Sequence, residues 1–443
     1  MFGVDFFDSK IIEGTTTSII LDNGNIKEVS VNYTKGAGIR ALSGGSWGIT
    51  SADGDFDLDK AIRAAAELAI GMNERSSKEK VEIMDITKPV VSNLPKVKVD
   101  PRDISLEEKV TLLSEIGKRA KLDDISSVSA VYSESTYKIM YSDSTGIDGE
   151  YDITRTGFAI SAVASRNGIY QAGRESRFGV TGYELFEKHD AFGLAESAAK
   201  TALQLLDARP AKGGAMPVIL DPELAGVFAH EAVGHASEAD LVLEGSSILE
   251  NRIGQEIASP LINVIDDPTL HEYGYFPFDD EGAQSEKTVV IKDGVLNSYL
   301  HSRETAAKLG GKPGHSRAQG HSRPIVRMSN TYIDNGTSKF EEMLEEIGNG
   351  VYLIGSRGGQ VNTGEGVFQF NAEKGYLIEN GELTTLLRDV SLSGKTLEIL
   401  NNVKMVGDDL KMNSGRCGKG GQLVPVTDGS PHLMVSEALV GGA

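Results

Sequence analysis

Alternating apolar and polar positions dominate the first half of the chain and are interrupted by helical patterns. Residues 17–50 contain three short runs that alternate as strands do. Between residues 58 and 72 the apolar positions recur at steps of three and four, which predicts a helix capped by Asp57. Residues 89–101 indicate an extended linker, and an S-x-x-E capping box at Ser105 opens a second helix.

The pattern changes again near the middle of the chain. Residues 125–182 predict an antiparallel meander, and residues 184–206 predict a helix. The segment DARPAKGG then combines proline and glycine, which favours a boundary between a domain over 1–209 and a domain over 210–443. The expected fold class is α+β: an N-terminal mixed α/β domain with antiparallel strands, followed by a β-rich C-terminal domain.

The second domain begins with a strand that leads directly into a helix. The strand is MPVIL, and the helix has Asp221 as its N-cap and Pro222 at its first position. Beyond residue 245 the chain consists mainly of short β runs and glycine loops. The helix after the first strand therefore stands out in a β-rich domain, and it contains the motif HEAVGH.

Composition narrows the classes of partner and compartment. The net charge of −20 provides no basic surplus for neutralising phosphates, so no nucleic-acid partner is expected. Cys417 is the single cysteine, which rules out an intramolecular disulfide and favours a reducing cytoplasm. No run approaches the roughly 18 apolar residues of a membrane span, and the N-terminus lacks the pattern of a signal peptide. We expect a cytoplasmic protein without a membrane partner.

Two short motifs resemble binding sites but lack the context that those sites need. The G-x-G-x-x-A run from Gly36 to Ala41 precedes strand and turn residues, whereas a dinucleotide site needs a helix there. The acidic run from residue 53 has Leu58 in place of the glycine of a calcium loop and Ala64 in place of its bidentate carboxylate. We therefore expect no cofactor-binding residues in either motif.

The spacing within HEAVGH is one residue longer than the metalloprotease pattern H-E-x-x-H. In an α-helix, residues four apart differ by roughly 40° around the axis, whereas residues five apart, such as His230 and His235, differ by about 140°. A π-bulge brings residues five apart onto one face, and Gly234 makes a distortion easy. We therefore predict a π-turn or a break at Val233–His235.

Two histidines leave the third ligand of a catalytic zinc site open. Such a site uses three protein ligands and keeps a position for water. Glu238 or Asp240 would complete the site locally, whereas Cys417 lies in the distant glycine-rich run SGRCGKGGQ, and residue chemistry alone does not choose between them. Glu231 would act as general base beside the metal. The alternative is a helix with two ordinary histidines and no metal.

Several separate segments carry a resemblance over most of the chain. HEAVGH is followed by SEAD, and CGKGGQLVPV stands near the C-terminus; between and before them lie GAGIRALSGGSWGITSAD, RFGVTGYELF, DDEG, SRPIVRMSNTYI and GGQVNTGEGVFQFNAEKGYLIENGE. These segments and their order resemble the TldD/PmbA family of metallopeptidases, specifically its metal-bearing TldD-type branch, in which the five-residue spacing HExxxH belongs to the pattern.

The resemblance assigns roles that the residues alone left open. It implies that His230, His235 and Cys417 are the metal ligands and that Glu231 is the catalytic carboxylate. Glu238 and Asp240 then become candidates for orienting a ligand imidazole. A further set of basic residues in a glycine-rich loop forms the pool for oxyanion stabilisation or substrate contact: His315, His321, Arg323 and Arg327.

The resemblance also implies a substrate class and a partner. We expect a zinc peptidase, with iron as the alternative metal, that hydrolyses unfolded or extended peptides. Strand addition would bind such peptides with little regard to sequence. The family implies a dimer with a related subunit lacking HExxxH, or else with a second copy of this chain. The competing hypotheses are a regulatory or binding protein with a structural metal and a hydrolase that uses Cys417 as nucleophile.

Overall fold

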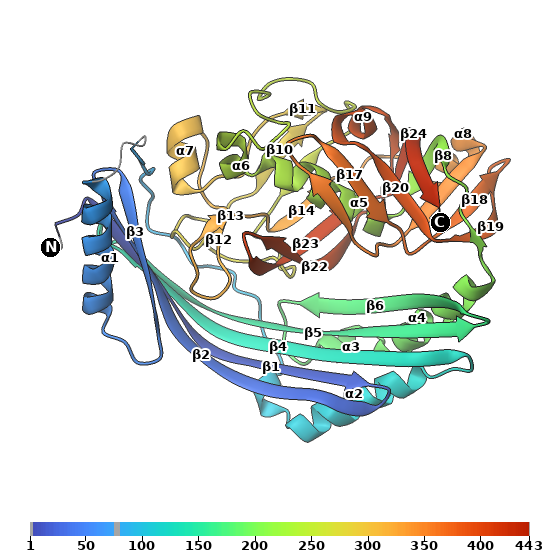
Figure 1. Ribbon diagram of the computed structural model, residues 1–443, viewed down its shortest axis with the longest axis horizontal. Coiled ribbons are helices and arrows are strands. Elements are labelled where there is room, and N and C mark those ends of the chain that lie inside the picture. Colours follow the sequence, from blue (N-terminus) through green and yellow to red (C-terminus); the bar gives the residue numbers. More distant parts are fainter. Residues whose placement is uncertain (1–2, 75–79, 443) are drawn as a thin grey trace.

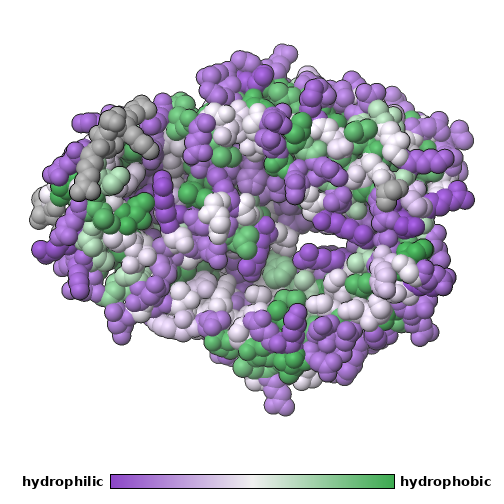
Figure 2. Space-filling model, in the orientation of Figure 1, coloured by the Kyte–Doolittle hydropathy of each residue, from purple (hydrophilic) through white to green (hydrophobic). Residues whose placement is uncertain are grey.

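The computed structural model describes residues 3–74 and 80–442 and has a mixed α+β fold, which confirms the predicted class. A long, curved sheet formed by the N-terminal half lies along one side of the molecule, and the C-terminal half packs against it (Figure 1). Polar side chains cover most of the visible surface, and an opening lies between the two halves (Figure 2). No helix among the described residues is long and apolar enough to cross a membrane.

The N-terminal sheet is antiparallel throughout, with strand order β3-β2-β1-β4-β5-β6. Its strands are β1 (Phe6–Asp22), β2 (Asn25–Ser43), β3 (Ser46–Asp53), β4 (Ile125–Asp143), β5 (Asp148–Arg166) and β6 (Ile169–Gly179). The predicted meander is therefore present as β4, β5 and β6. The short runs expected over residues 17–50 are in fact parts of longer strands. Gly36 and Gly38 do not interrupt β2, because they make room for His321, whose atoms lie 2.5 Å and 2.3 Å from where their Cβ atoms would be.

The helices of this half cover the sheet and follow the sequence signals closely. They are α1 (Leu58–Asn73), η1 (Pro101–Asp103), α2 (Leu106–Arg119), α3 (Leu185–Lys188) and α4 (Ala191–Asp207). Asp57 caps α1, and the capping box at Ser105 is formed. The predicted linker has no helix or strand from residue 80 to residue 100. The single helix expected over 184–206 is broken, because Asp190 accepts a hydrogen bond from the Gly193 N–H (2.9 Å) and starts α4.

Two sheets form the C-terminal half. The larger has the order β16-β17-β20-β24-β8-β15-β18-β19-β7, with β21 also pairing with β24, and its strands are β7 (Arg209–Pro210), β8 (Gly214–Leu220), β15 (Gly350–Ile354), β16 (Gly359–Asn362), β17 (Val367–Asn371), β18 (Lys374–Glu379), β19 (Glu382–Arg388), β20 (Val390–Lys395), β21 (Val403–Val406) and β24 (Leu433–Gly442). The smaller has the order β11-β10-β9-β14-β23-β22, and its strands are β9 (Val264–Asp266), β10 (Thr288–Lys292), β11 (Val295–Leu296), β14 (Asn330–Ile333), β22 (Lys411–Lys419) and β23 (Gln422–Ser430).

Short helices and one hairpin complete this half. They are α5 (Pro222–Phe228), η2 (Ala229–Gly234), η3 (His235–Ser237), α6 (Ala239–Leu243), α7 (Arg303–Leu309), α8 (Phe340–Ile347), α9 (Thr396–Asn401) and the pair β12 (Ser316–Arg317) and β13 (Ile325–Val326). The segment from α5 to α6 belongs to the largest hydrophobic cluster, in which Leu224 and Phe228 are fully buried. The motif helix is therefore held from several sides by the β-rich core.

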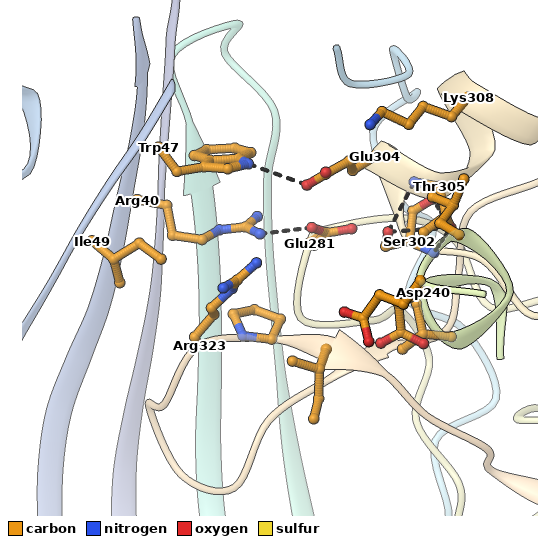
Figure 3. A pocket seen from close by; sticks show the side chains of 15 residues that line it. Arg40, Trp47, Ile49, Asp240, Glu281, Ser302, Glu304, Thr305, Lys308 and Arg323 are labelled. Carbon is orange, nitrogen blue, oxygen red and sulfur yellow. Dashed lines mark hydrogen bonds and ion pairs between the residues drawn. The ribbon is translucent and has the colours of Figure 1, made fainter. Parts of the chain in front are cut away.

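A cavity of about 290 Å³ lies where the two halves meet (Figure 3). Arg40 and Trp47 line it from β2 and β3, while Glu304 of α7 and Asp240 of α6 line it from the C-terminal half. The indole N–H of Trp47 donates to Glu304 at 3.3 Å. Side chains from both halves therefore enclose this cavity.

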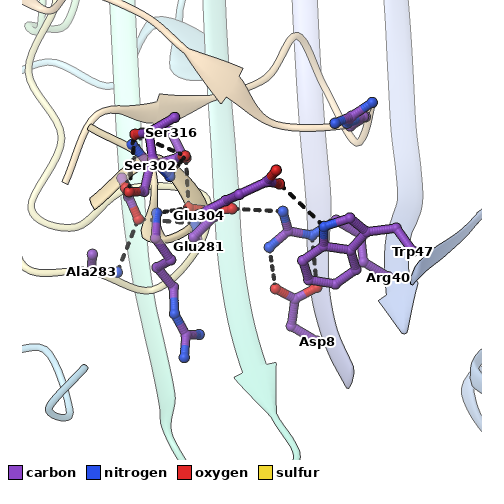
Figure 4. A network of polar contacts seen from close by, with 12 residues as sticks. Asp8, Arg40, Trp47, Glu281, Ala283, Ser302, Glu304 and Ser316 are labelled. Atoms are coloured by element: carbon purple, nitrogen blue, oxygen red, sulfur yellow. Dashed lines mark hydrogen bonds and ion pairs between the residues drawn. The ribbon is translucent and has the colours of Figure 1, made fainter. Parts of the chain in front are cut away.

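A buried network of ion pairs joins the halves beside the cavity (Figure 4). The Arg40 guanidinium donates to Asp8 (3.0 Å) in the N-terminal sheet and to Glu281 (2.6 Å) in the C-terminal half. Glu281 also accepts from the Arg303 backbone N–H (2.8 Å) and from the Ser316 hydroxyl (2.7 Å). Because Arg40 is paired with carboxylates from both halves, it helps to hold their relative position.

Candidate metal centre

The motif helix changes its hydrogen-bonding pattern along its length. Asp221 caps α5 by accepting from the Leu224 N–H at 2.9 Å. The chain then forms a π-helix over η2 (Ala229–Gly234) and a 3-10 turn over η3. The predicted π-turn is therefore present, although it begins four residues earlier than expected.

Gly234 has a packing role in addition to its flexibility. Its backbone is in the ordinary right-handed helical region. A Cβ atom at this position would lie only 1.9 Å from the Met328 Sδ atom. The absence of a side chain therefore lets the π-helix approach the segment before β14, and this approach fixes where the helix can lie.

The π-helix and a distant strand bring three metal-binding side chains together. One ligand atom each of His230, His235 and Cys417 lies within 4.8 Å of the other two. The Cys417 Sγ atom is 3.3 Å from the His235 Nε2 atom, and the two imidazole rings are nearly perpendicular, with centroids 5.3 Å apart. All three residues are buried. Cys417 comes from β22, which pairs with β23 in a hairpin against α5.

The electrostatics of the cluster favour a thiolate. Burial raises the pKa of the Cys417 thiol, but the charges and hydrogen bonds of His230 and His235 outweigh burial and bring that pKa down to about 4. Burial lowers the pKa of His230, but the charge and hydrogen bond of the Cys417 thiolate, together with the charge of Glu231, outweigh burial, so that pKa is raised. A thiolate is the form of cysteine that binds metals.

This donor set fits a zinc ion. Two atoms bound to one tetrahedral zinc, an imidazole nitrogen and a thiolate sulfur, lie about 3.5–3.6 Å apart at the usual bond lengths. The observed separation of 3.3 Å between Sγ and Nε2 is within about 0.3 Å of this value. Three protein donors leave a fourth position open, which is the arrangement of catalytic rather than structural zinc sites.

Glu231 lies at the edge of the cluster, where water can reach it. Its Oε2 atom is 3.9 Å from the His235 Nε2 atom, which is the same nitrogen that faces the Cys417 sulfur. The side chain is 32 % exposed, in contrast to the buried ligands. A carboxylate in this position is close to a metal held by the cluster and also open to solvent, as a general base requires.

A chain of charged groups contacts His235 at Nδ1, the ring nitrogen that does not face Cys417. The Glu238 Oε2 atom is 2.9 Å from the His235 Nδ1 atom. Lys419 lies 3.1 Å from the same Glu238 oxygen and donates to Asp240 at 2.7 Å and 2.8 Å. Burial raises the pKa of Glu238, but His235 and Lys419 outweigh it, so that pKa is lowered. Glu238 and Asp240, the two acidic candidates from the sequence, therefore lie together on the Nδ1 side of His235 and share Lys419.

Lys419 is a residue of this site that the sequence reasoning missed. It follows Cys417 by two positions in β22, so both side chains project from the same face of that strand. The period-2 pattern of the strand was a signal that could have revealed it. Asp240 also lines the cavity between the halves, so Lys419 connects that cavity to the cluster.

The four basic residues proposed for oxyanion or substrate contact lie in different places. Arg327 is buried and donates to the backbone oxygens of Cys417 and of Gln422 (3.3 Å), so it contacts the centre through the hairpin backbone. His315 is buried with its Nε2 atom 3.3 Å from Asp266, a residue of β9. The other two lie at the contact between the halves: His321 pairs with Asp53 at 3.1 Å, and Arg323 lines the cavity.

Comparison with known proteins places the chain in a family. Three family models match consecutive parts of it: PmbA/TldA metallopeptidase domain 1 over residues 11–71, the central domain over 99–206 and the C-terminal domain over 213–442. The chain belongs to the PmbA/TldD metallopeptidase family. The resemblance inferred from the sequence motifs is thus confirmed.

Individual members of the PmbA/TldD family match over nearly their whole length. A metalloprotease of Archaeoglobus fulgidus is 45 % identical over 99 % of this chain and 100 % of that protein. A protein of Saccharolobus solfataricus named zinc metalloprotease TldD homolog is 32 % identical over 94 % of this chain and 92 % of its own. The crystal structure of TldE from Thermococcus kodakarensis superposes with a TM-score of 0.77 over 99 % of this chain and 97 % of that one; at 20 % identity this likeness shows the fold alone.

Proposed function

We propose that the chain is a zinc-dependent peptidase in which His230, His235 and Cys417 hold the metal and Glu231 is the general base. The observation that carries the proposal is the convergence of two imidazoles and one thiolate beside a solvent-accessible carboxylate. The name of the Saccharolobus solfataricus relative supports zinc rather than iron. Zinc in such a site supplies a Lewis acid that polarises a carbonyl and lowers the pKa of a bound water.

The chain's own residues then have distinct tasks. Glu231 takes the proton from the attacking water and afterwards delivers it to the amine that leaves the cleaved peptide bond. Glu238, held by Lys419, keeps the His235 ring in the orientation that presents its Nε2 atom to the metal. The buried position of Cys417 and its contact with both imidazoles favour a ligand over a nucleophile, which needs access to the substrate.

We propose extended peptides as substrates. The strand that carries Cys417, β22, ends its sheet among the described residues. The neighbouring strand β6 approaches it where the Phe178 N–H donates to the Ser414 hydroxyl at 3.2 Å. An extended peptide that pairs along the rest of this edge would pass the cluster, and main-chain pairing gives little sequence preference.

We further propose that the chain associates with a second, related subunit. The first part of β2, before Gly36, has no partner strand on its outer side among the described residues, because β3 pairs only with Gly36–Ser43. Ile26, Val31 and Tyr33 are more than half exposed along this stretch. An unprotected strand edge with apolar side chains is a surface on which proteins commonly add another strand. A reducing cytoplasm suits a site that depends on a single thiolate.

The decisive experiment compares the wild type with Glu231→Gln on an unstructured peptide, with and without a chelator. We expect the variant to keep its zinc, because Glu231 is not one of the three ligands, and to lose 10²–10⁴-fold in kcat, which is the usual contribution of general base catalysis. Zinc content is measured by metal analysis of the same samples. Hydrolysis that continues unchanged in the variant, or in the chelated wild type, would refute the mechanism.

A further inference from the structure

The two imidazoles of the cluster differ in how their Nδ1 atoms are satisfied. The Nδ1 atom of His235 lies 2.9 Å from Glu238. His230 is at least as buried, yet its Nδ1 atom has no hydrogen-bond partner among the described residues. A metal-binding histidine almost always donates its other ring N–H to a carboxylate, a carbonyl or a water. A buried N–H without a partner costs about 1–3 kcal/mol. An acceptor for His230 is therefore expected nearby.

Asp428 of β23 has a buried carboxylate oxygen, Oδ1, that lacks a hydrogen-bond donor among the residues described. Burial raises the pKa of Asp428 to about 7, and interaction with His230 opposes this rise, so the two side chains are close enough to interact. An unsatisfied acceptor and an unsatisfied donor thus lie in the same part of the core.

Gly226 shows on which side of the motif helix Asp428 lies. A Cβ atom on Gly226 would be 3.1 Å from the Asp428 Oδ1 atom and 3.1 Å from the Gly429 backbone nitrogen. Residues four apart share a helical face, so the carboxylate lies along the face that also carries His230. A glycine at this position is therefore what allows β23 to bring a carboxylate against this face.

We propose that Asp428 orients His230 in the metal-loaded protein by accepting its Nδ1–H, directly or through one water. Each imidazole then has its own carboxylate: Glu238 follows the motif helix in sequence and serves His235, whereas Asp428 comes from the opposing strand and serves His230. The proposal rests on the metal centre described above. Asp428 is a positioning residue, because it acts on the metal through His230.

Zinc affinity of the full-length chain, measured by competition with a chromophoric chelator, tests this role. Removal of a carboxylate that orients a metal ligand costs about 10–100-fold in metal affinity, and we expect this loss for Asp428→Ala. Asp428→Asn keeps an oxygen that can accept the N–H, so its loss should be only several-fold. Glu223→Gln is the matched control, because Glu223 is a neighbouring carboxyl group that interacts with Asp428 and itself accepts from the Ser356 N–H at 3.4 Å.

A second readout observes the hydrogen bond itself. In ¹⁵N spectra of the zinc-loaded protein with labelled histidine, His230 should show an exchange-protected Nδ1–H signal that disappears in Asp428→Ala, while the His235 signal persists. If Asp428→Ala does not fold, the same signal in Asp428→Asn decides, since a weaker acceptor must shift it.

Three results would overturn the assignment. The first is a zinc affinity of Asp428→Ala within about threefold of the wild type, which is a much smaller loss than removal of an orienting carboxylate usually causes. The second is a loss of zinc affinity in Glu223→Gln as large as that in Asp428→Asn. The third is a protected His230 signal that survives in Asp428→Ala. A wild-type protein without zinc affinity would instead refute the metal centre, so the two failures are distinguishable.

Discussion

Replacing Arg40 with methionine should destabilise the contact between the two halves strongly. The Arg40 side chain is 8 % exposed and donates to Asp8 and to Glu281, which are 4 % exposed each. Its removal leaves two buried carboxylates without their main counter-charge. Loss of one partner of a buried ion pair costs about 3–5 kcal/mol. Because Arg303 remains close to both acids, we expect a value near the lower end, about 3 kcal/mol.

The destabilisation should depend on pH in a defined direction. Burial already raises the pKa of Asp8 although Arg40 opposes the rise, and the pKa of Glu281 is lowered only because Arg40 and neighbouring donors outweigh burial. Without Arg40, both pKa values rise in the folded state. A carboxyl group whose pKa is higher in the folded than in the unfolded state, where it is about 4, lowers the free energy of unfolding as the pH rises through this range. Below about pH 4 the group is protonated in both states and this penalty is absent. The effect of Arg40→Met should therefore be largest near pH 7–8 and smaller near pH 5.

The single tryptophan of the chain provides the assay. The Arg40 guanidinium lies 4.8 Å from the centre of the Trp47 ring, and Trp47 donates to Glu304 across the cavity, so its emission reports opening of this contact. Urea titrations at pH 5 and pH 7.5 compare the wild type, Arg40→Met and the control Lys88→Met. Lys88 pairs with Asp148 at the surface, where a pair contributes less than about 1 kcal/mol. Equal midpoints for the two variants, or a loss that does not change with pH, would show that the reasoning is wrong.

The remaining predictions concern the motif helix, its support and the free strand edge. Gly234→Ala places a Cβ atom 1.9 Å from the Met328 Sδ atom, so we expect overpacking to cost about 1–3 kcal/mol, measured by thermal unfolding, with Gly71→Ala, which has open space, as control. Lys419→Met removes the cation that holds Glu238 and should weaken zinc binding about tenfold in a chelator competition, whereas Lys411→Met at the far end of the same strand should not. Val31→Lys on the exposed edge should shift a dimer toward monomers in light scattering, and an unchanged mass would argue against this edge as the interface.

Features set by neighbouring residues could be predicted from the sequence. The capping box at Ser105 and the cap at Asp57 depend on contacts three residues away, so the local sequence is enough to predict both. The π-helix follows from the five-residue step between His230 and His235 once both are required to face one metal. The contact of His235 with Glu238 is likewise a three-residue step within the same segment.

Features set by distant residues could not be predicted in the same way. The sequence pattern predicted only short runs over residues 17–50, but Gly36 lies within the continuous strand β2, and His321, from the other half of the chain, packs against it. Cys417 is 182 positions from His235, so only the family resemblance, and no spacing rule, chose it over the nearer Glu238 and Asp240. The sheet that carries Cys417 is built from strands dispersed over the C-terminal half, and no local pattern reveals their order.

The motifs that carry the family resemblance do more than supply the cluster of His230, His235 and Cys417. GAGIRA contains Arg40 and DDEG contains Glu281, and these two residues pair across the contact between the halves. HEAVGH and CGKGG supply the clustered histidines and cysteine. The cavity links the two sets, since Arg40 lines it together with Asp240, whose carboxylate is bound by Lys419 behind His235. The N-terminal sheet therefore forms one wall of the cavity that Asp240 and Lys419 connect to the cluster of His230, His235 and Cys417.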